Sequence, residues 1–347
     1  MTSLSDLGEF GLIDRLAASL GPAATHPSLV QGIGDDAAVV RLTDDRVLVV
    51  TTDALVEGVH FDRAMTPMER LGFKAVSVNV SDVCAMNARP TVVTVALVLP
   101  PSMAVEDVDA LYAGIRRACE RYGCALAGGD TTQGHALTLS VTALGEARTS
   151  DVVYRRGARV GDLVCVTGDV GAAFAGLKTL LDAREALRAD PAYVPDFSER
   201  QYVVARQLAP TARLDAVDAF ERAGVRPSAM MDVSDGVASE VHHIARHSGV
   251  GIRLYEAAIP IDPETREVAT AFEADAPVFA LFGGEDYELL FTMSEEDLER
   301  LPQEGLFRAI GRVVPQAEGV TVQTAEGDEI ALSAGGFTHF TPPPADL

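Results

Sequence analysis

The 347-residue sequence lacks several patterns that define common classes of protein. No apolar segment approaches the ~20 residues that span a bilayer. The first residues, MTSLSDLGEFGLIDRL, contain no basic region followed by an apolar run, so no secretory signal is evident. We therefore expect a cytoplasmic protein that does not bind a membrane.

Metal-ligand spacings of the zinc type are also missing. The four cysteines are Cys84, Cys119, Cys124 and Cys165. They form no CxxC pair and occur in apolar or helix-like segments, which is typical of reduced core thiols in a cytosolic protein. His243 and His247 are spaced for one helix face, but no HExxH motif accompanies them. We interpret both histidines as ordinary helix-surface residues.

Positive charge is scarce, with 28 lysines and arginines against 51 aspartates and glutamates. Such a surface repels nucleic acid and anionic membrane, so neither is an expected partner, and a bound nucleotide would need cations beside it. No GxxxxGK[ST] motif is present, which excludes a P-loop. Most of the acidic excess can serve solubility alone, so any functional argument depends on motifs.

The length and the apolar content favour two medium-sized domains, each with its own core. We place the boundary near residue 150, giving domains 1–150 and 151–347. For the first domain we predict helices over 9–20, 67–86 and 105–122 and strands over 37–41, 47–51, 91–99, 125–126 and 137–146.

For the second domain we predict strands over 162–167 and 230–233, with the last strands over 288–292 and 308–313. Helices are expected in TGDVGAAFAGLKTLL, toward Gln207 and over 237–247, with an irregular segment over 190–200. Both halves mix helices with strands, so the predicted fold class is mixed α/β (α+β).

Carboxylates recur beside glycine or hydroxyl residues in five segments. These are GIGDDAAVV (Asp35, Asp36), TTDALVEGVHF (Thr51, Thr52, Asp53), NVSDV (Asp82), GGDTT (Asp130) and DVSDG (Asp232, Ser234, Asp235). We expect each to lie where a strand ends. Mg²⁺ prefers oxygen ligands, and a neighbouring glycine lets the backbone approach a phosphate closely. Together the segments predict one site that holds several metal ions.

Each segment also has a simpler interpretation. A single aspartate at a strand end commonly makes a turn or caps a helix, as Asp82 or Asp235 could. The glycine-rich TGDVGAAFAG could present helix amides to an anion or could serve close packing. Arg155 and Arg156 could meet a phosphate or form a solvated basic turn. Paired acids in several apolar segments are harder to explain as turns, which favours metal binding.

Taken in order along nearly the whole chain, these segments together with NVSDVCAMNARP and GGEDYELLF resemble the thiamine-monophosphate kinase family of the aminoimidazole-ribonucleotide-synthetase-like superfamily. The resemblance implies a two-domain, PurM-like architecture and ATP-dependent phosphorylation of thiamine monophosphate to thiamine diphosphate. It further implies a homodimer whose amino-terminal domains, holding the metal and ATP site, join their sheets. The carboxy-terminal α/β domain would complete the nucleotide and substrate site.

The resemblance also assigns site residues. Matching positions for Mg²⁺ are Asp36, Thr51, Thr52, Asp53, Asp82, Asp130, Asp232 and Asp235. Those for ATP are Tyr112, Gly129, Asp130, Arg155 and Ser234, and those for thiamine monophosphate are His60, Glu285 and Phe337. Within GGFTHF, Phe337 keeps a stacking ring without the polar group that the family often carries there.

The expected mechanism follows from the charge of the acceptor. A phosphate oxygen of thiamine monophosphate is already ionised near neutral pH, so no catalytic general base is expected and transfer should be direct. Two alternatives remain open. One is another ATP-using member of the superfamily, although the first cysteine is Cys84 and no reactive terminal cysteine is present. The other is a non-catalytic acidic protein that binds cations.

Overall fold

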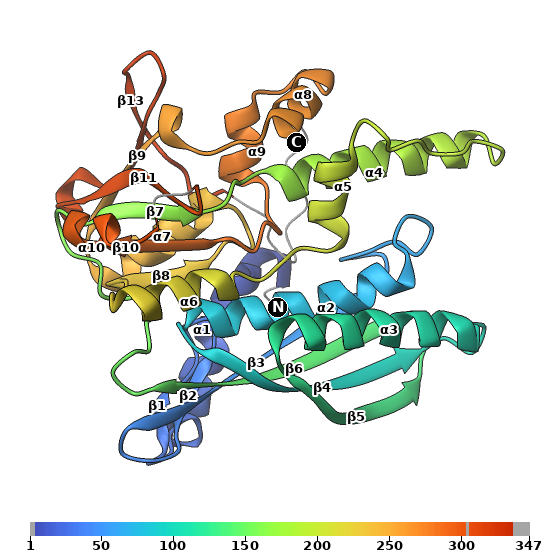
Figure 1. Ribbon diagram of the computed structural model, residues 1–347, viewed down its shortest axis with the longest axis horizontal. Helices are drawn as coiled ribbons and strands as arrows, with labels where there is room; N and C mark the ends of the chain where they lie inside the picture. Colours follow the sequence, from blue (N-terminus) through green and yellow to red (C-terminus); the bar gives the residue numbers. More distant parts are fainter. Residues whose placement is uncertain (1–3, 303–304, 336–347) are drawn as a thin grey trace.

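The computed structural model describes residues 4–302 and 305–335 and contains two β-sheets with helices packed between and around them (Figure 1). The first sheet takes its strands from residues 29–148 and the second from residues 163–331. The predicted mixed α/β class is confirmed. The domain boundary near residue 150 stays a prediction. In the part of the chain that is described, no helix has the length and apolar content needed to cross a bilayer.

The first sheet has six strands. Their order across the sheet is β1 (Leu29–Gln31), β2 (Ala38–Arg41), β3 (Arg46–Val56), β6 (Thr138–Arg148), β4 (Arg89–Leu99) and β5 (Ala125–Gln133). All neighbours are antiparallel except β4 and β5. Alternate residues of β6 are buried, and the buried face is covered by α2 (Met68–Ala85) and α3 (Val105–Tyr122) (Figure 1).

Two glycines allow α2 and α3 to pack with their backbones in contact. A Cβ atom on Gly72 would lie 2.0 Å from the carbonyl oxygen of Leu111. A Cβ atom on Gly114 would lie 1.9 Å from the carbonyl oxygen of Glu69. Neither position can hold a side chain without moving a helix backbone. This contact fixes how closely α2 and α3 pack side by side on the sheet.

Helix α2 is buried on both sides. Every residue from Leu71 to Ala85 is buried except Asp82. The helix contacts β3, β4 and β6 on one side, and β8 (Ala229–Asp232), α5 (Gln201–Leu208) and α6 (Leu214–Ala223) on the other. Since buried polar groups need partners, the polar side chains of α2 mark specific contacts between the two halves of the chain.

The second sheet has seven strands. Their order is β13 (Glu329–Ala331), β12 (Val320–Gln323), β9 (Gly251–Tyr255), β11 (Phe307–Val314), β7 (Leu163–Thr167), β10 (Leu289–Met293) and β8. Only β9 and β12 are parallel neighbours. Residues of β7, β8 and β10 face two cores alternately. Met231 and Leu290 face α7 (Val237–Ser248), whereas Met230 and Phe291 join the core that contains α2 and α6.

Several of the remaining helices pack against one another and form a third core. Helices α4 (Ala172–Ala189), α5, α8 (Pro263–Ala271) and α9 (Ala276–Phe282) share a third core that includes Val203 and Phe279. Helix α1 (Leu4–Leu20) precedes the first sheet, and the short α10 (Glu295–Glu299) follows β10. Cys84, Cys119 and Cys165 are buried, as expected, while Cys124 is half-buried.

Most predicted elements are present, but several differ. The expected end of the strands at residue 313 is wrong, because β12 and β13 follow β11. The strand expected over 125–126 extends to Gln133, since parallel pairing with β4 continues through GGDTT. Helices α6, α8, α9 and α10 and strands β1 and β9 are not among the predicted elements.

Candidate active site

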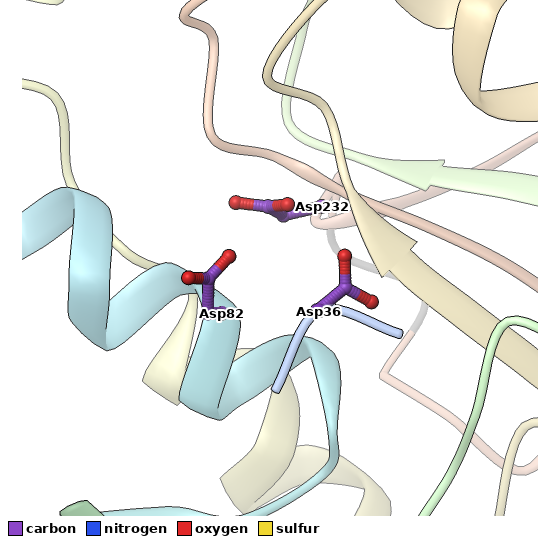
Figure 2. A group of neighbouring side chains, drawn as sticks. All are labelled: Asp36, Asp82 and Asp232. Atoms are coloured by element: carbon purple, nitrogen blue, oxygen red, sulfur yellow. The ribbon is translucent and has the colours of Figure 1, made fainter. Parts of the chain in front are cut away.

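Three carboxylates from distant parts of the chain meet between the two sheets. Asp36 lies in the loop before β2, Asp82 lies on α2, and Asp232 is the last residue of β8. Each contributes an oxygen atom, and these atoms all lie within 4.8 Å of one another (Figure 2). We refer to these three residues as the carboxylate group.

Each member of the carboxylate group is held by a neighbouring side chain. The Thr51 hydroxyl donates to Asp82 Oδ2 at 2.6 Å, and the Ser81 hydroxyl donates to Asp232 Oδ2 at 2.6 Å. A nitrogen of the Arg155 guanidinium lies 2.6 Å from Asp36 Oδ1. The three acids therefore have fixed positions rather than free rotation.

The electrostatics of the group favour a bound cation. Burial, followed by the charges of neighbouring aspartates, raises the pKa of Asp82 well above its usual range. The same causes raise the pKa of Asp232 to about 8, and burial raises the pKa of Asp53 to about 6. Like charges at this distance disfavour ionisation unless a cation compensates them.

The donor set fits Mg²⁺. The three acids and Thr51 offer oxygen atoms, which hard divalent cations prefer. Asp36 Oδ2 is buried and has no hydrogen-bond partner. A buried, unpaired carboxylate oxygen costs free energy that a metal ligand bond would recover. The arrangement can therefore hold a divalent cation between the two halves of the chain.

The other residues predicted for the metal site differ in how they lie relative to the carboxylate group. Asp53 is on the same face of β3 as Thr51, and its backbone N–H donates to Asn79 Oδ1 on α2 at 3.0 Å. The side chain of Thr52 points to the opposite face, where its hydroxyl donates to the carbonyl oxygen of Val141 at 3.0 Å. Asp235 follows Asp232 in the loop before α7.

The expectation that every acidic segment lies at a strand end is wrong for three of them. Asp53 lies within β3, because antiparallel pairing with β6 continues past it to Val56. Asp82 lies inside α2, and Asp130 lies within β5. Capping of a following helix therefore does not explain Asp82.

The residues predicted to contact ATP occupy two places in the chain. Arg155 contacts Asp36 of the carboxylate group, and Ser234 follows Asp232 by two residues. Tyr112 lines a pocket of about 550 Å³ between α3 and the start of β5, and Gly129 and Asp130 lie on the exposed strand β5.

The two neighbouring arginines have different surroundings. Arg155 is paired with Asp36 and is not a solvated turn residue. Arg156 is half-exposed; it donates to Gln31 Oε1 at 2.6 Å, and its guanidinium carbon lies 4.2 Å from the centre of the Tyr154 ring.

Of the three residues predicted to bind thiamine monophosphate, two lie in the described part of the chain. His60 follows β3, and its Nδ1 accepts the backbone N–H of Val56 at 3.1 Å. Glu285 lies between the two halves of the chain, with one oxygen 2.7 Å from Lys74 Nζ. Phe337 lies outside the described residues.

Three buried charged residues of this region were not predicted. The Glu240 carboxylate accepts the N–H groups of Ser234 and Asp235 at 3.2 and 2.8 Å, which fixes the DVSDG loop. An acid four residues after a glycine at a helix start is a weak signal for such a contact. Lys74 and Asp286 act across long sequence separations, so no local pattern indicates their contacts.

The glycine-rich start of α4 does meet an anion, but the anion belongs to the chain. The Asp286 carboxylate accepts the backbone N–H groups of Gly171 at 2.6 Å and Ala173 at 3.0 Å. The glycine-rich segment also packs closely against α9, because a Cβ atom on Gly171 would lie 2.8 Å from the Ala280 nitrogen.

The prediction that His243 is a helix-surface residue is wrong. Its side chain is buried rather than on the helix surface, because its face of α7 packs inward. Burial and the nearby charge of Arg155 lower the pKa of His243 to about 3, so the ring is neutral.

Comparison with known proteins defines the class to which this fold and site belong. Residues 34–147 match the AIR synthase related protein N-terminal domain, and residues 159–323 match the AIR synthase related protein C-terminal domain. The thiamine-monophosphate kinase of Aquifex aeolicus is 38% identical over 97% of this chain and 99% of its own length. That of Bacillus subtilis is 33% identical over 96% of this chain and its full length.

A solved structure described as AaThiL complexed with AMPPCP and TMP is similar as well. It has a TM-score of 0.83 and 37% identity, and the similarity covers 98% of this chain and 99% of that one. The fold and the acidic site thus define a two-domain protein of the AIR synthase related class. Within that class, the chain belongs to the thiamine-monophosphate kinase family and is a kinase.

The raised pKa values predict how Mg²⁺ stabilises the fold. Without a bound cation, the folded chain keeps protons on Asp82 and Asp232 that it would release on unfolding near neutral pH. Its stability should therefore rise as the pH falls below about 8. Mg²⁺ must displace these protons, so it should raise Tm by roughly 3–5 °C at pH 8 and by less near pH 6.

Thermal unfolding with and without Mg²⁺ at the two pH values measures this effect. Asp82→Asn should lose most of the Mg²⁺-dependent shift at pH 8. Asp328→Asn, in the exposed turn before β13, serves as the control and should keep the shift. An equal shift in the wild type and in Asp82→Asn would contradict the assignment.

Proposed function

We propose that the chain transfers the γ-phosphoryl group of ATP directly to the phosphate of thiamine monophosphate, yielding thiamine diphosphate and ADP. The carboxylate group, with its unpaired Asp36 oxygen, carries the proposal. The structure of a relative described with AMPPCP and TMP supports this choice of substrates. The acceptor phosphate is itself ionised, so the site has to neutralise and orient two anions rather than remove a proton.

Among the metal ligands that the family resemblance assigns, Asp36, Asp82 and Asp232 lie together and form the proposed metal site. These residues would hold Mg²⁺, whose charge would screen and align both phosphate groups. Thr51 and Ser81 keep the acids in place before substrates arrive, since each hydroxyl already donates to one carboxylate. Such preorganisation avoids rearrangement during the reaction.

Arg155 has a second role in the proposal. Two of its nitrogen atoms contact Asp36 Oδ1, at 2.6 and 3.2 Å. A guanidinium carries five N–H donors, so others remain for a phosphate oxygen of ATP. Ser234 lies two residues after Asp232 on the loop that Glu240 fixes, and its hydroxyl is the further donor to ATP in this proposal.

The proposed acceptor can be tested by coupled ADP release. Release should require thiamine monophosphate and should be absent with free thiamine or without an acceptor. Another ATP-using member of the superfamily would fail to respond to thiamine monophosphate. A cation-binding protein without catalytic activity would release no ADP with any acceptor, and either result would overturn the proposal.

Substitution of the central acid gives a second prediction. Asp82→Asn should lower kcat by about a thousandfold or more, because several kcal/mol of charge stabilisation depends on the metal site. The control Asp328→Asn should match the wild type in the same assay. Unfolding curves for both variants would show whether the fold is intact. Substantial turnover by folded Asp82→Asn at saturating Mg²⁺ would refute the metal assignment.

We further propose that the chain forms a homodimer through its first sheet. Every residue of the edge strand β5 is exposed, although this strand contains Gly129 and Asp130, which are predicted to contact ATP or metal. A long exposed edge strand normally pairs with another strand or is covered. A second copy that covers β5 would also enclose the pocket lined by Tyr112.

Sedimentation equilibrium tests the homodimer. The expected mass is twice the 36.7 kDa of one chain. Thr131→Pro, within β5, should shift the mass toward that of one chain, because proline removes a backbone donor and disrupts edge pairing. A wild-type mass of one chain at all accessible concentrations would contradict the proposal.

A further inference from the structure

Lysine is rare in this chain, and one of its lysines is buried next to the proposed substrate site. Lys74 and Lys178 are the only lysines among the 28 lysines and arginines. Lys178 lies near the rings of Phe174 and Phe272. The Lys74 side chain is 3% exposed, and its Nζ atom lies 2.7 Å from Glu285 Oε1. The other 26 of these 28 residues (28 − 2) are arginines, which makes a buried lysine at this position notable.

Gln207 holds the other oxygen of the same carboxylate. Its Nε2 donates to Glu285 Oε2 at 2.6 Å. Because a carboxylate only accepts, the amide nitrogen must face Glu285, and the amide oxygen is thereby assigned. That oxygen, Gln207 Oε1, is buried and has no hydrogen-bond partner. A cation from α2 and an amide from α5 therefore fix one carboxylate from two sides.

The backbone around Glu285 is fixed as well. Glu285 has φ 66° and Tyr287 has φ 52°, both in the left-handed region that disfavours side chains. The N–H groups of these two residues donate to the carbonyl oxygens of Ser234 at 2.7 Å and Val233 at 2.9 Å. Strained conformations persist where the surrounding structure requires them, and they cluster at ligand sites. Glu285 thus has a defined position relative to the DVSDG loop.

Helix α2 relates this carboxylate to the carboxylate group. Lys74 and Ser81 are seven residues apart, so their side chains leave the same face of the helix. Ser81 contacts Asp232 at one point of this face, and Lys74 contacts Glu285 at the other. Seven residues span about 10 Å along the axis. A substrate with a phosphate at one end and a ring at the other fits such a separation.

We propose that Lys74 is a positioning residue for the ring end of the acceptor. Lys74 and Gln207 together hold the Glu285 carboxylate. The remaining lone pairs of this carboxylate would accept hydrogen bonds from the amino group on the pyrimidine ring of thiamine monophosphate. An ionised carboxylate has about four lone-pair sites, and Lys74 and Gln207 occupy two. The Glu285 side chain remains 25% exposed, which leaves it accessible to a ligand. This inference rests on the proposed function.

A purely structural ion pair would not need these features. Arg89 on β4 already connects the two halves at the surface, contacting Asp218 at 2.6 Å and Glu221 at 2.5 Å on α6. Those exposed side chains keep much of their hydration. Burial of Lys74 instead removes a compact ammonium from water, at a desolvation cost that a surface pair avoids. Ordering of the Glu285 carboxylate for a ligand explains why the buried Lys74–Glu285 pair is present.

Steady-state kinetics of Lys74→Met tests the inference. The KM for thiamine monophosphate should rise about tenfold or more, since a contact to a charged group is lost. The kcat should stay within about threefold and the KM for ATP should not change, because the carboxylate group is intact. Arg89→Met removes a different ion pair between the same halves and should leave all three constants unchanged.

The alternative results are distinct. If Lys74→Met lowers Tm but keeps the wild-type KM for thiamine monophosphate, the pair is structural and the inference is wrong. If Lys74→Met does not fold, Gln207→Leu decides. The same selective rise in KM supports the inference, and an unchanged KM overturns it. Failure of the wild type to use thiamine monophosphate would instead refute the proposed function.

Discussion

The burial of helix α2 on both sides is the constraint on which the site depends. One side of the helix fits against the first sheet and, through paired glycines, against α3. The other side meets the second half of the chain, and there its polar residues find partners. Because α2 cannot move without disturbing both cores, Asp82 is held rigidly against Asp36 and Asp232.

Charge explains why so acidic a chain can serve as a kinase. The carboxylate group gathers negative charge, and Arg155 is in direct contact with it. Under the proposed function, two anionic substrates would also come together there. The site is therefore incomplete electrostatically without added cations. In the proposed function, bound Mg²⁺ would supply the positive charge that the protein and the phosphates both lack. The absence of a P-loop motif is consistent with this proposal, because the proposed metal ligands come from separate segments instead of one loop.

Much of this arrangement could be predicted from the sequence, and the remainder could not for physical reasons. Regular apolar patterns give α2 and α3 almost to the residue. The grouping of acids and glycines indicates an acidic site, and three of these acids do meet in the structure. However, Asp82 lies on a helix and Asp53 within a strand, because long-range pairing extends β3 beyond its apolar run.

Contacts across the chain are the part that local patterns miss. Lys74 and Glu285 are separated by 211 positions along the sequence (285 − 74), and Asp286 caps a helix that begins at Ala172. Neither pairing leaves a periodic signal, since each depends on how the two halves pack. The buried state of His243 is missed for the same reason: the helical spacing is correct, but the face it occupies is decided by tertiary packing.

The most direct test of the metal site is anomalous diffraction from crystals grown with Mn²⁺, which shares the oxygen-ligand preference of Mg²⁺. The account predicts an anomalous peak within coordination distance of the oxygens of Asp36, Asp82 and Asp232. A peak elsewhere, with none between these three carboxylates in crystals of active enzyme, would contradict it.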